Sequence, residues 1–183
     1  MSILAESPVA VLPEGTWAID PAHSTVEFLV QHMGLATVRG RAPVVTGTIT
    51  GGAQPAIEGT VSVAHLTTHD EGRDAHLRSP EFFDAERYPE IRFASTSVEA
   101  HGDEVVVVGD LEIKGVAHPV ELRGRFLGQA VDPWGNDRIG VELSTVVDRA
   151  KWGLTWNAPL PDGGLLLPDD VELHASFSAV RTG

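Results

Sequence analysis

An alternating strand pattern is clearest in residues 17–32, which read Trp17-Ala18-Ile19-Asp20-Pro21-Ala22-His23-Ser24-Thr25-Val26-Glu27-Phe28-Leu29-Val30-Gln31-His32. The Asp-Pro turn leads into a strand expected over residues 24–32. Because successive strand side chains point to opposite faces, one face carries Val26, Phe28, Val30 and His32. An apolar row that ends in a histidine indicates either a lined cavity or a barrel core with one hydrogen-bonded histidine.

Length and composition set bounds on the fold. The 183 residues fit a single domain, expected over residues 16–183 behind a flexible tail at residues 1–15. The 19 glycines and 12 prolines are scattered, as turns between many strands require. The hydrophobic share of 42% is typical of a globular protein.

Charge and cysteine content narrow the partners and the chemistry. The formal net charge is -13, from 26 acidic and 13 basic residues, so we expect no nucleic-acid partner. The lack of cysteine excludes disulfides, thiolate metal sites and cysteine nucleophiles. Residues 1–8 lack a basic leader and a long apolar run, which predicts a cytoplasmic location. The sequence has no apolar run long enough to predict stable membrane insertion.

Turn-rich links separate eight expected strands. Gly, Pro and Asp cluster between runs of alternating or β-branched residues, and the short links favour an antiparallel meander. The second run owes its β character to residues such as Val44, Val45 and Thr46. The expected strands cover residues 24–32, 37–51, 56–66, 90–100, 104–113, 118–130, 137–148 and 170–181.

A short helical excursion near residues 69–86 interrupts the strands. Thr68 and Glu71 have the spacing of a capping box, which predicts a short helix directly after them. Ser79-Pro80-Glu81 is a second start signal and predicts one more helical turn over residues 82–85.

Eight antiparallel strands can close into a barrel or stack as a sandwich. Closure removes exposed sheet edges, and the interior of a small barrel is either filled or holds one small ligand. A strand of about 12 residues spans about 40 Å, which suits a narrow tube. We therefore expect an all-β, eight-stranded antiparallel barrel of extended shape, with a sandwich as the structural alternative.

Five ordered motifs resemble the YceI-like family and together span residues 16–180. They are Trp17-Ala18-Ile19-Asp20 followed by His23-Ser24, residues 73–84 (RDAHLRSPEFFD) followed by Tyr88-Pro89, residues 109–116 (GDLEIKGV), Asp132-Pro133-Trp134-Gly135, and residues 148–157 (DRAKWGLTWN). The resemblance implies an extended lipocalin-like barrel that binds a polyisoprenoid or other long amphiphile in an apolar pore, often as a homodimer. We expect no cofactor and no catalytic residues. Typical members begin with a signal peptide, and we expect none here because residues 1–8 do not have the features of one.

An isoprenoid tail needs a dry apolar channel, whereas a phosphate, quinone or amide head needs a few hydrogen-bond donors. The residues expected to contact the tail are Val26, Phe28, Val30, Phe82, Phe83, Phe93, Trp152, Leu154 and Trp156. The residues expected to contact the head are His23, His32, His76 and Arg78. Two alternatives stay open at this point: the apolar residues fill a solid core, and Arg73 with Asp74, or Arg78 with Glu81 or Asp84, form local ion pairs.

Two other kinds of chemistry have weaker support. His65, His69 and His76 do not have the spacing of a known metal motif, so we expect no metal. Ser24 could pair with His23 or His76 in a hydrolase, but a Gly-x-Ser-x-Gly elbow is missing from the sequence.

The sequence thus predicts a cytoplasmic, non-enzymatic carrier or reservoir for a polyisoprenoid-type amphiphile. The first alternative is an enzyme that acts on a small hydrophobic substrate, with His32 or His76 as general acid or base. The second is an interaction or stress-related module with a solid barrel.

Overall fold

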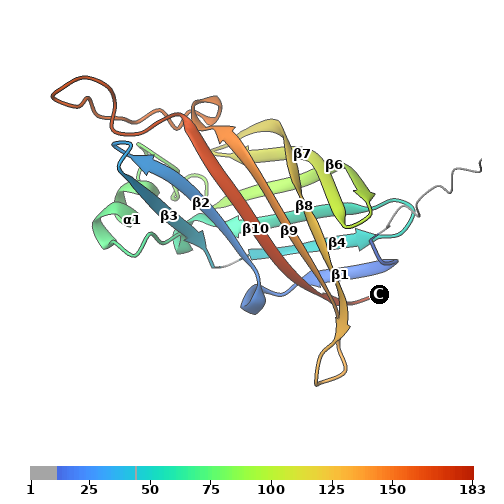
Figure 1. Ribbon diagram of the computed structural model, residues 1–183. Helices are drawn as coiled ribbons and strands as arrows, with labels where there is room; N and C mark the ends of the chain where they lie inside the picture. The colour runs from blue at the N-terminus through green and yellow to red at the C-terminus, as the bar shows by residue number, and fades with distance from the viewer. Residues whose placement is uncertain (1–11, 44) are drawn as a thin grey trace, which may run out of the picture.

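The computed structural model describes residues 12–43 and 45–183, whose strands form one antiparallel sheet that closes on itself (Figure 1). The strands are β1 (Gly15–Ile19), β2 (Thr25–His32), β3 (Ala36–Ala42), β4 (Val45–Gly51), β5 (Ala56–Ser62), β6 (Glu90–His101), β7 (Glu104–Ile113), β8 (Val116–Val131), β9 (Asp137–Asp148) and β10 (Asp170–Arg181). The helical segments are α1 (Glu71–Arg78) and the 3-10 turns η1 (Pro21–His23), η2 (Val63–His65) and η3 (Arg149–Trp152).

The ring closes through β1. The sheet order is β1-β4-β5-β6-β7-β8-β9-β10-β2-β3, and β1 also pairs with β10. Within the described ranges, the closed ring therefore contains eight strands, namely β1 and β4 to β10. This confirms the predicted eight-stranded antiparallel barrel and its meander of consecutive strands.

In two places the wall of the barrel consists of a pair of separate strands that follow one another along the wall, β1 with β2 and β4 with β3. β1 pairs with the last part of β10, where Ile19 lies opposite Ala179, and β2 pairs with its first part, where Thr25 lies opposite Ser176. β4 and β3 continue the wall beside them in the same way. The prediction of a single strand over residues 37–51 was therefore wrong, since β3 and β4 divide it, and Val44 lies outside the described residues. The sequence interpretation also missed β1, a short strand just before the Asp-Pro turn.

At one end of the barrel, α1 and the segment before it cover a break in the wall. β5 pairs with β4 and β6, whereas β3 meets residue Thr67 of the segment that leads into α1. Two backbone hydrogen bonds, from Arg41 to Thr67 at 2.8 Å and back at 3.0 Å, join them. Figure 1 shows α1 beside β3 at this end. The helical excursion therefore replaces a stretch of strand pairing.

The predicted helix exists, but its cap was assigned to the wrong residue. Asp70 is the N-cap of α1, and its carboxylate accepts a hydrogen bond from the backbone N–H of Arg73 at 2.8 Å. Thr68 lies too far back for that position and instead bonds Asp74. Residues 82–85 form hydrogen-bonded turns rather than a helical turn. The predicted strand over residues 56–66 ends at Ser62, because η2 follows it.

The end of the barrel that contains β1 is packed solid. Trp17 is fully buried at its centre, and its indole N–H donates to the carbonyl oxygen of Pro13 at 3.1 Å. Leu12, within the stretch expected to form a tail, is 2% exposed and belongs to this core. The fully buried residues around Trp17 include Ile49, Val105, Val107, Val141 and Ala179.

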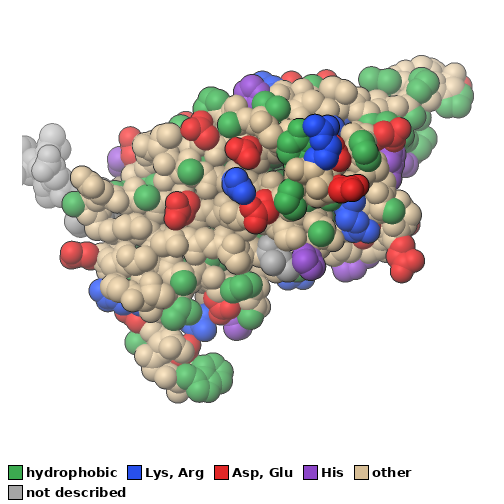
Figure 2. Space-filling view, turned by 180° about the vertical axis from the view of Figure 1, so that it is seen from behind, with side chains coloured by type: hydrophobic (Ala, Val, Ile, Leu, Met, Phe, Trp, Pro, Cys, Tyr) green, Lys and Arg blue, Asp and Glu red, His purple; other side chains and the backbone are tan. Residues whose placement is uncertain are grey.

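The outer surface mixes acidic and basic side chains over the sheet, with hydrophobic side chains at two protruding segments (Figure 2). One is the β8–β9 hairpin, where Trp134 is 82% exposed, and the other is the loop over residues 157–169, where Leu165 is 60% exposed. In the described ranges, α1 and the shorter helical turns all lack the length and hydrophobicity that a bilayer-spanning helix requires.

Candidate ligand-binding cavity

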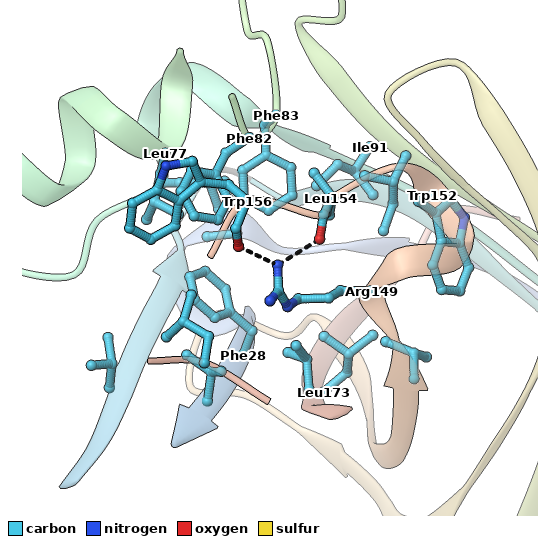
Figure 3. A pocket seen from close by; sticks show the side chains of 18 of the residues that line it. Phe28, Leu77, Phe82, Phe83, Ile91, Arg149, Trp152, Leu154, Trp156 and Leu173 are labelled. Carbon is cyan, nitrogen blue, oxygen red and sulfur yellow. Dashed lines mark hydrogen bonds between the residues drawn. The ribbon is translucent and has the colours of Figure 1, made fainter. Parts of the chain in front are cut away.

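A cavity of about 480 Å³ occupies the end of the barrel that α1 covers. Its walls come from β2, β3, α1, the start of β6, the end of β7, the start of β10, and the 157–169 loop with the segment before it. Apolar side chains make up most of its surface, and Figure 3 shows several of them around the cavity. Volumes of this size are typical of sites for small ligands.

The alternating row of β2 forms one wall of the cavity. The four residues predicted to share a face, Val26, Phe28, Val30 and His32, all line it. Leu29 and Gln31 lie on the outer face, beside Arg39 and His174. The alternation predicted from the sequence therefore holds from Phe28 to His32, while Glu27 borders both the cavity and the outer face.

A missing side chain makes room for Phe28. Gly40 of β3 lies directly opposite Phe28 in the strand pair. A Cβ atom at Gly40 would come within 2.0 Å of the Phe28 ring, closer than atoms can approach. The glycine thus fixes where the ring lies in the cavity wall.

An aromatic cluster forms the opposite wall. The His76 ring packs edge-on against Phe82 and Trp156, with centroid distances of 4.9 and 4.6 Å. Its Nε2 lies 2.5 Å from a carboxylate oxygen of Glu81, which orients the ring. The indole N–H of Trp152 donates to the backbone carbonyl of Leu111 at 2.9 Å, so its ring is fixed as well. These contacts hold the cavity wall in a defined shape.

Arg149 is a charged cavity residue that the sequence interpretation missed. Its side chain is 6% exposed and lines the cavity from η3. Its guanidinium donates to the backbone carbonyls of Leu154 and Trp156 at 2.6 and 2.9 Å (Figure 3). Burial lowers the pKa of Arg149, and the charges of Asp169 and Asp148 oppose that shift. The one signal for Arg149 in the sequence was its place in the DRAKWG motif of residues 148–153.

Most of the predicted site residues meet at this cavity. Those that line it are Val26, Phe28, Val30, His32, His76, Phe82, Phe83, Trp152, Leu154 and Trp156. Phe93 lines a second, deeper cavity of about 100 Å³. Five residues, Val26, Val61, Ile91, Leu111 and Leu173, line both cavities, so the two lie next to each other along the barrel.

His23 and Arg78 lie away from the lining of either cavity. The Nδ1 of His23 lies 2.8 Å from a carboxylate oxygen of Asp20, and the ring is exposed. Arg78 donates to the backbone carbonyl of Leu66 at 3.5 Å. The partner of Arg78, Leu66, does line the cavity, but the Arg78 side chain itself does not.

The predicted local ion pairs are replaced by other contacts. Arg73 donates to the hydroxyl and the backbone carbonyl of Thr68, at 2.7 and 2.9 Å, instead of pairing with Asp74. Asp74 accepts from the backbone N–H and the hydroxyl of Thr68. Burial raises the pKa of Asp74, but these hydrogen bonds outweigh it and the net shift is downward.

Asp84 and Glu81 also have partners other than Arg78. Arg87 lies 3.8 Å from Asp84, and His76 contacts Glu81. Arg78 still contributes at longer range, since its charge helps to lower the pKa of Asp74.

The residues considered for a metal site and for a hydrolase make other contacts in the structure. The Nδ1 of His65 lies 2.8 Å from the hydroxyl of Ser62, away from His76 in the cavity. In residues 12–43 and 45–183, no three His, Cys, Asp or Glu side chains gather as metal ligands would. The hydroxyl of Ser24 donates to the backbone carbonyl of Ser178, so it is held by β10 rather than by a histidine.

The closed antiparallel ring, packed at one end and hollow at the other, defines a lipocalin-like β-barrel. Residues 17–179 match the model of the YceI-like domain, and the chain belongs to this family. A relative from Photorhabdus laumondii, UPF0312 protein plu2095, is 39% identical over 126 residues, which are 67% of this chain and 66% of that protein. The match thus spans just under two thirds of the relative's length.

Solved structures share the fold at lower sequence identity. BcnA of Burkholderia cenocepacia superposes with a TM-score of 0.73 at 20% identity, over 90% of this chain and 99% of that one. A polyisoprenoid binding domain from Saccharophagus degradans, implicated in plant cell wall breakdown, superposes with a TM-score of 0.68 at 15% identity, over 91% and 98%. At these identities the likeness shows the fold alone.

Proposed function

We propose that the chain binds a long-chain amphiphile of the polyisoprenoid type in its barrel, as a carrier or reservoir. The observation that carries the proposal is the apolar cavity of about 480 Å³, adjoined by the deeper one of about 100 Å³. Burial of hydrocarbon in such walls contributes about 25 cal/mol per Å² before the costs of association. The fold shared with a polyisoprenoid binding domain supports the same class of ligand.

The proposal assigns the tail to the aromatic and aliphatic walls. The isoprenoid units pack between Phe28 on one side and Phe82 with Trp156 on the other, and the chain end points toward Phe93 in the deeper cavity. Of the predicted head-group residues, His32 and His76 line the cavity and remain candidates for polar contacts. A polyisoprenyl phosphate or a quinone would satisfy both regions.

Extraction of the native protein tests the proposal. Protein purified under gentle conditions, without detergent, is extracted into organic solvent, and the extract is analysed by mass spectrometry. We expect a long-chain lipid that is absent from a mock purification. After delipidation, a long-chain prenol should quench the fluorescence of Trp152 and Trp156, which line the cavity. Repeated extraction without a lipid, together with no quenching, would count against the proposal.

Two variants separate a carrier from an enzyme. A carrier has no turnover, so in a carrier His32→Ala and His76→Ala lower only the affinity for the ligand. In an enzyme with a histidine acid or base, turnover collapses while binding persists. The two cavities argue against the second alternative, a module with a solid barrel, because both cavities would be filled in that case.

The finer parts of the proposal are a cytoplasmic location and a homodimer. Fractionation of cells followed by immunodetection tests the location. Light scattering on the eluting protein tests the dimer, with and without a bound prenol. A monomer in both states, or recovery outside the cytoplasmic fraction, would remove the corresponding part.

A further inference from the structure

Arg149 places a positive charge inside an apolar cavity. Its side chain is 6% exposed, and its guanidinium points into the space between Phe28, Trp156 and Leu173 (Figure 3). Transfer of an unpaired charge into apolar surroundings is costly, so buried charges normally have a counter-ion. The partners of this guanidinium therefore indicate what the cavity is built to hold.

The three backbone carbonyls around Arg149 use only part of its hydrogen-bonding capacity. The Nε group donates to Pro168 at 2.9 Å, and Nη1 donates to both Leu154 and Trp156. A guanidinium has five N–H groups, and these contacts use three of them. The described residues provide no hydrogen-bond acceptor for Nη2. In the described residues no fully buried side-chain nitrogen lacks a partner, so Nη2 must be reachable from open space.

The charge of Arg149 is weakly compensated. Carbonyl groups accept hydrogen bonds but carry no net charge. The nearest carboxylate oxygen, on Asp169, lies 4.0 Å from Nη2, and that side chain is 68% exposed. Water screens such a pair and reduces its strength. The guanidinium nevertheless stays protonated, because arginine does so throughout the physiological pH range.

Two other polar side chains of the cavity wall, Arg73 and His76, already have partners, while Glu27 and His32 also line the cavity. Nε and Nη2 of Arg73 donate to Thr68, and Nε2 of His76 contacts Glu81. An incoming head group would have to displace these partners, whereas Nη2 of Arg149 can donate without any rearrangement.

We infer that Arg149 binds an anionic head group, either a carboxylate or a phosphate monoester, that is attached to a long apolar chain. The inference rests on the proposed function, because the apolar walls must hold the chain. An oxyanion at Nη2 would gain charge-assisted hydrogen bonds and would neutralise the buried charge. A neutral head of similar size would gain only one of these effects. Arg149 therefore selects anionic amphiphiles over neutral ones of equal chain length.

The test compares hexadecanoate, hexadecyl phosphate and hexadecanol, which share one chain and differ in head group. Delipidated full-length protein is titrated with each below its aggregation limit, and the change in the fluorescence of Trp152 and Trp156, which line the cavity, gives Kd. We expect both anions to bind about tenfold or more tightly than the alcohol. Inorganic phosphate should not displace hexadecyl phosphate, since the chain supplies most of the affinity.

Three variants test the residue itself. Arg149→Gln keeps an amide that can donate to the loop carbonyls but removes the charge, so the preference for anions should fall to about onefold while hexadecanol affinity persists. Arg149→Lys keeps the charge and should retain the preference. Arg87→Met is the matched control, because Arg87 is an exposed arginine paired with Asp84, and it should bind all ligands like the unaltered protein.

Each outcome bears on one claim. Equal affinity of the unaltered protein for all three ligands would overturn the role of Arg149 and leave the proposed function intact. Binding of none of them, nor of a prenol, would overturn the proposed function itself. Displacement of hexadecyl phosphate by inorganic phosphate would show a site for free anions and overturn the amphiphile as ligand. If thermal melting shows that Arg149→Gln is unfolded, the ligand comparison on the unaltered protein still decides.

Discussion

The two ends of this barrel are built from the same alternating strands, yet one is solid and the other is hollow. At the solid end β1 closes the ring between β4 and β10, and Trp17 fills the interior. At the hollow end β3 meets Thr67 instead of β5, and α1 covers the break. At the solid end an interior side chain such as Val107 is fully buried against other side chains. At the hollow end Phe28 faces the cavity.

The contrast shows where stability and binding are separated. Closed hydrogen bonding brings opposite walls close enough for side chains to meet, so packing is dense and each atom contributes to stability. Inserting a helix and irregular segments into the wall widens the ring beyond the reach of its side chains. The packing at the solid end can therefore stabilise the whole fold, including the hollow end, where the opposite walls do not contact each other.

The largest expected effect comes from removal of a tryptophan at each end. Trp17→Ala deletes a fully buried side chain and its hydrogen bond to Pro13, and should lower the free energy of unfolding by about 3 to 5 kcal/mol. Trp156→Ala removes a half-buried ring from a wall that already faces space, and should cost about 1 kcal/mol while it weakens ligand binding. Urea unfolding of both variants checks the difference.

The two tryptophan variants also control for each other. Trp17→Ala should leave the affinity for a prenol unchanged at temperatures where the variant is folded, since Trp17 lies outside the cavity walls. Equal destabilisation by both substitutions would contradict the division into a solid and a hollow end.

A smaller effect is expected when a valine is enlarged at each end. Val107→Phe adds volume to a fully packed site and should destabilise the fold by about 1 to 3 kcal/mol. Val30→Phe adds the same volume where the cavity offers room, so stability should change by less than about 0.5 kcal/mol. The measurements are thermal unfolding and prenol titration, and only Val30→Phe should reduce affinity. Loss of stability without loss of affinity for Val30→Phe would indicate that the cavity is not the binding site.

The sequence predicts the hollow end better where strands are regular. Alternation along β2 was enough to place Val26, Phe28, Val30 and His32 on one face, because a strand repeats every two residues. The eight-stranded barrel followed from turn spacing and from family resemblance together. Neither source could show where the ring is closed or broken, because closure depends on pairing between strands far apart in the sequence.

Irregular segments were harder to interpret, and Arg149 is the clearest case. Its partners are carbonyls of Leu154, Trp156 and Pro168, and no side-chain pattern predicts which way those carbonyls point. Arg78 illustrates a related difficulty. It lies on α1 five positions after Arg73, and at 100° per residue the two side chains point about 140° apart. Only Arg73 of this pair lines the cavity.

The smallest expected effect concerns an ion pair at the solid end and depends on pH. Arg138 of β9 contacts Asp20, before η1, and Asp132, in the β8–β9 hairpin, both at 2.8 Å. The Arg138 guanidinium, with help from His23, lowers the pKa of Asp20 from 3.8 to about 2. The same guanidinium lowers the pKa of Asp132. A lowered pKa means that the ionised carboxylate stabilises the folded state, and that this stability is lost as the pH falls.

We therefore expect Asp20→Asn to lower the free energy of unfolding by about 1 kcal/mol at pH 7, because the pair is partly open to water. The difference from the unaltered protein should persist down to the ordinary pKa of 3.8 and vanish near pH 2, where Asp20 becomes protonated in the folded state. Urea unfolding across this pH range measures it. Glu99→Gln is the control, since Glu99 is exposed and lies 3.6 Å from His101 at the surface. A deficit in Asp20→Asn that stays constant down to pH 2 would mean that the charge of Asp20 is not what stabilises the folded state, since asparagine keeps an oxygen that can accept from the N–H of Ala22.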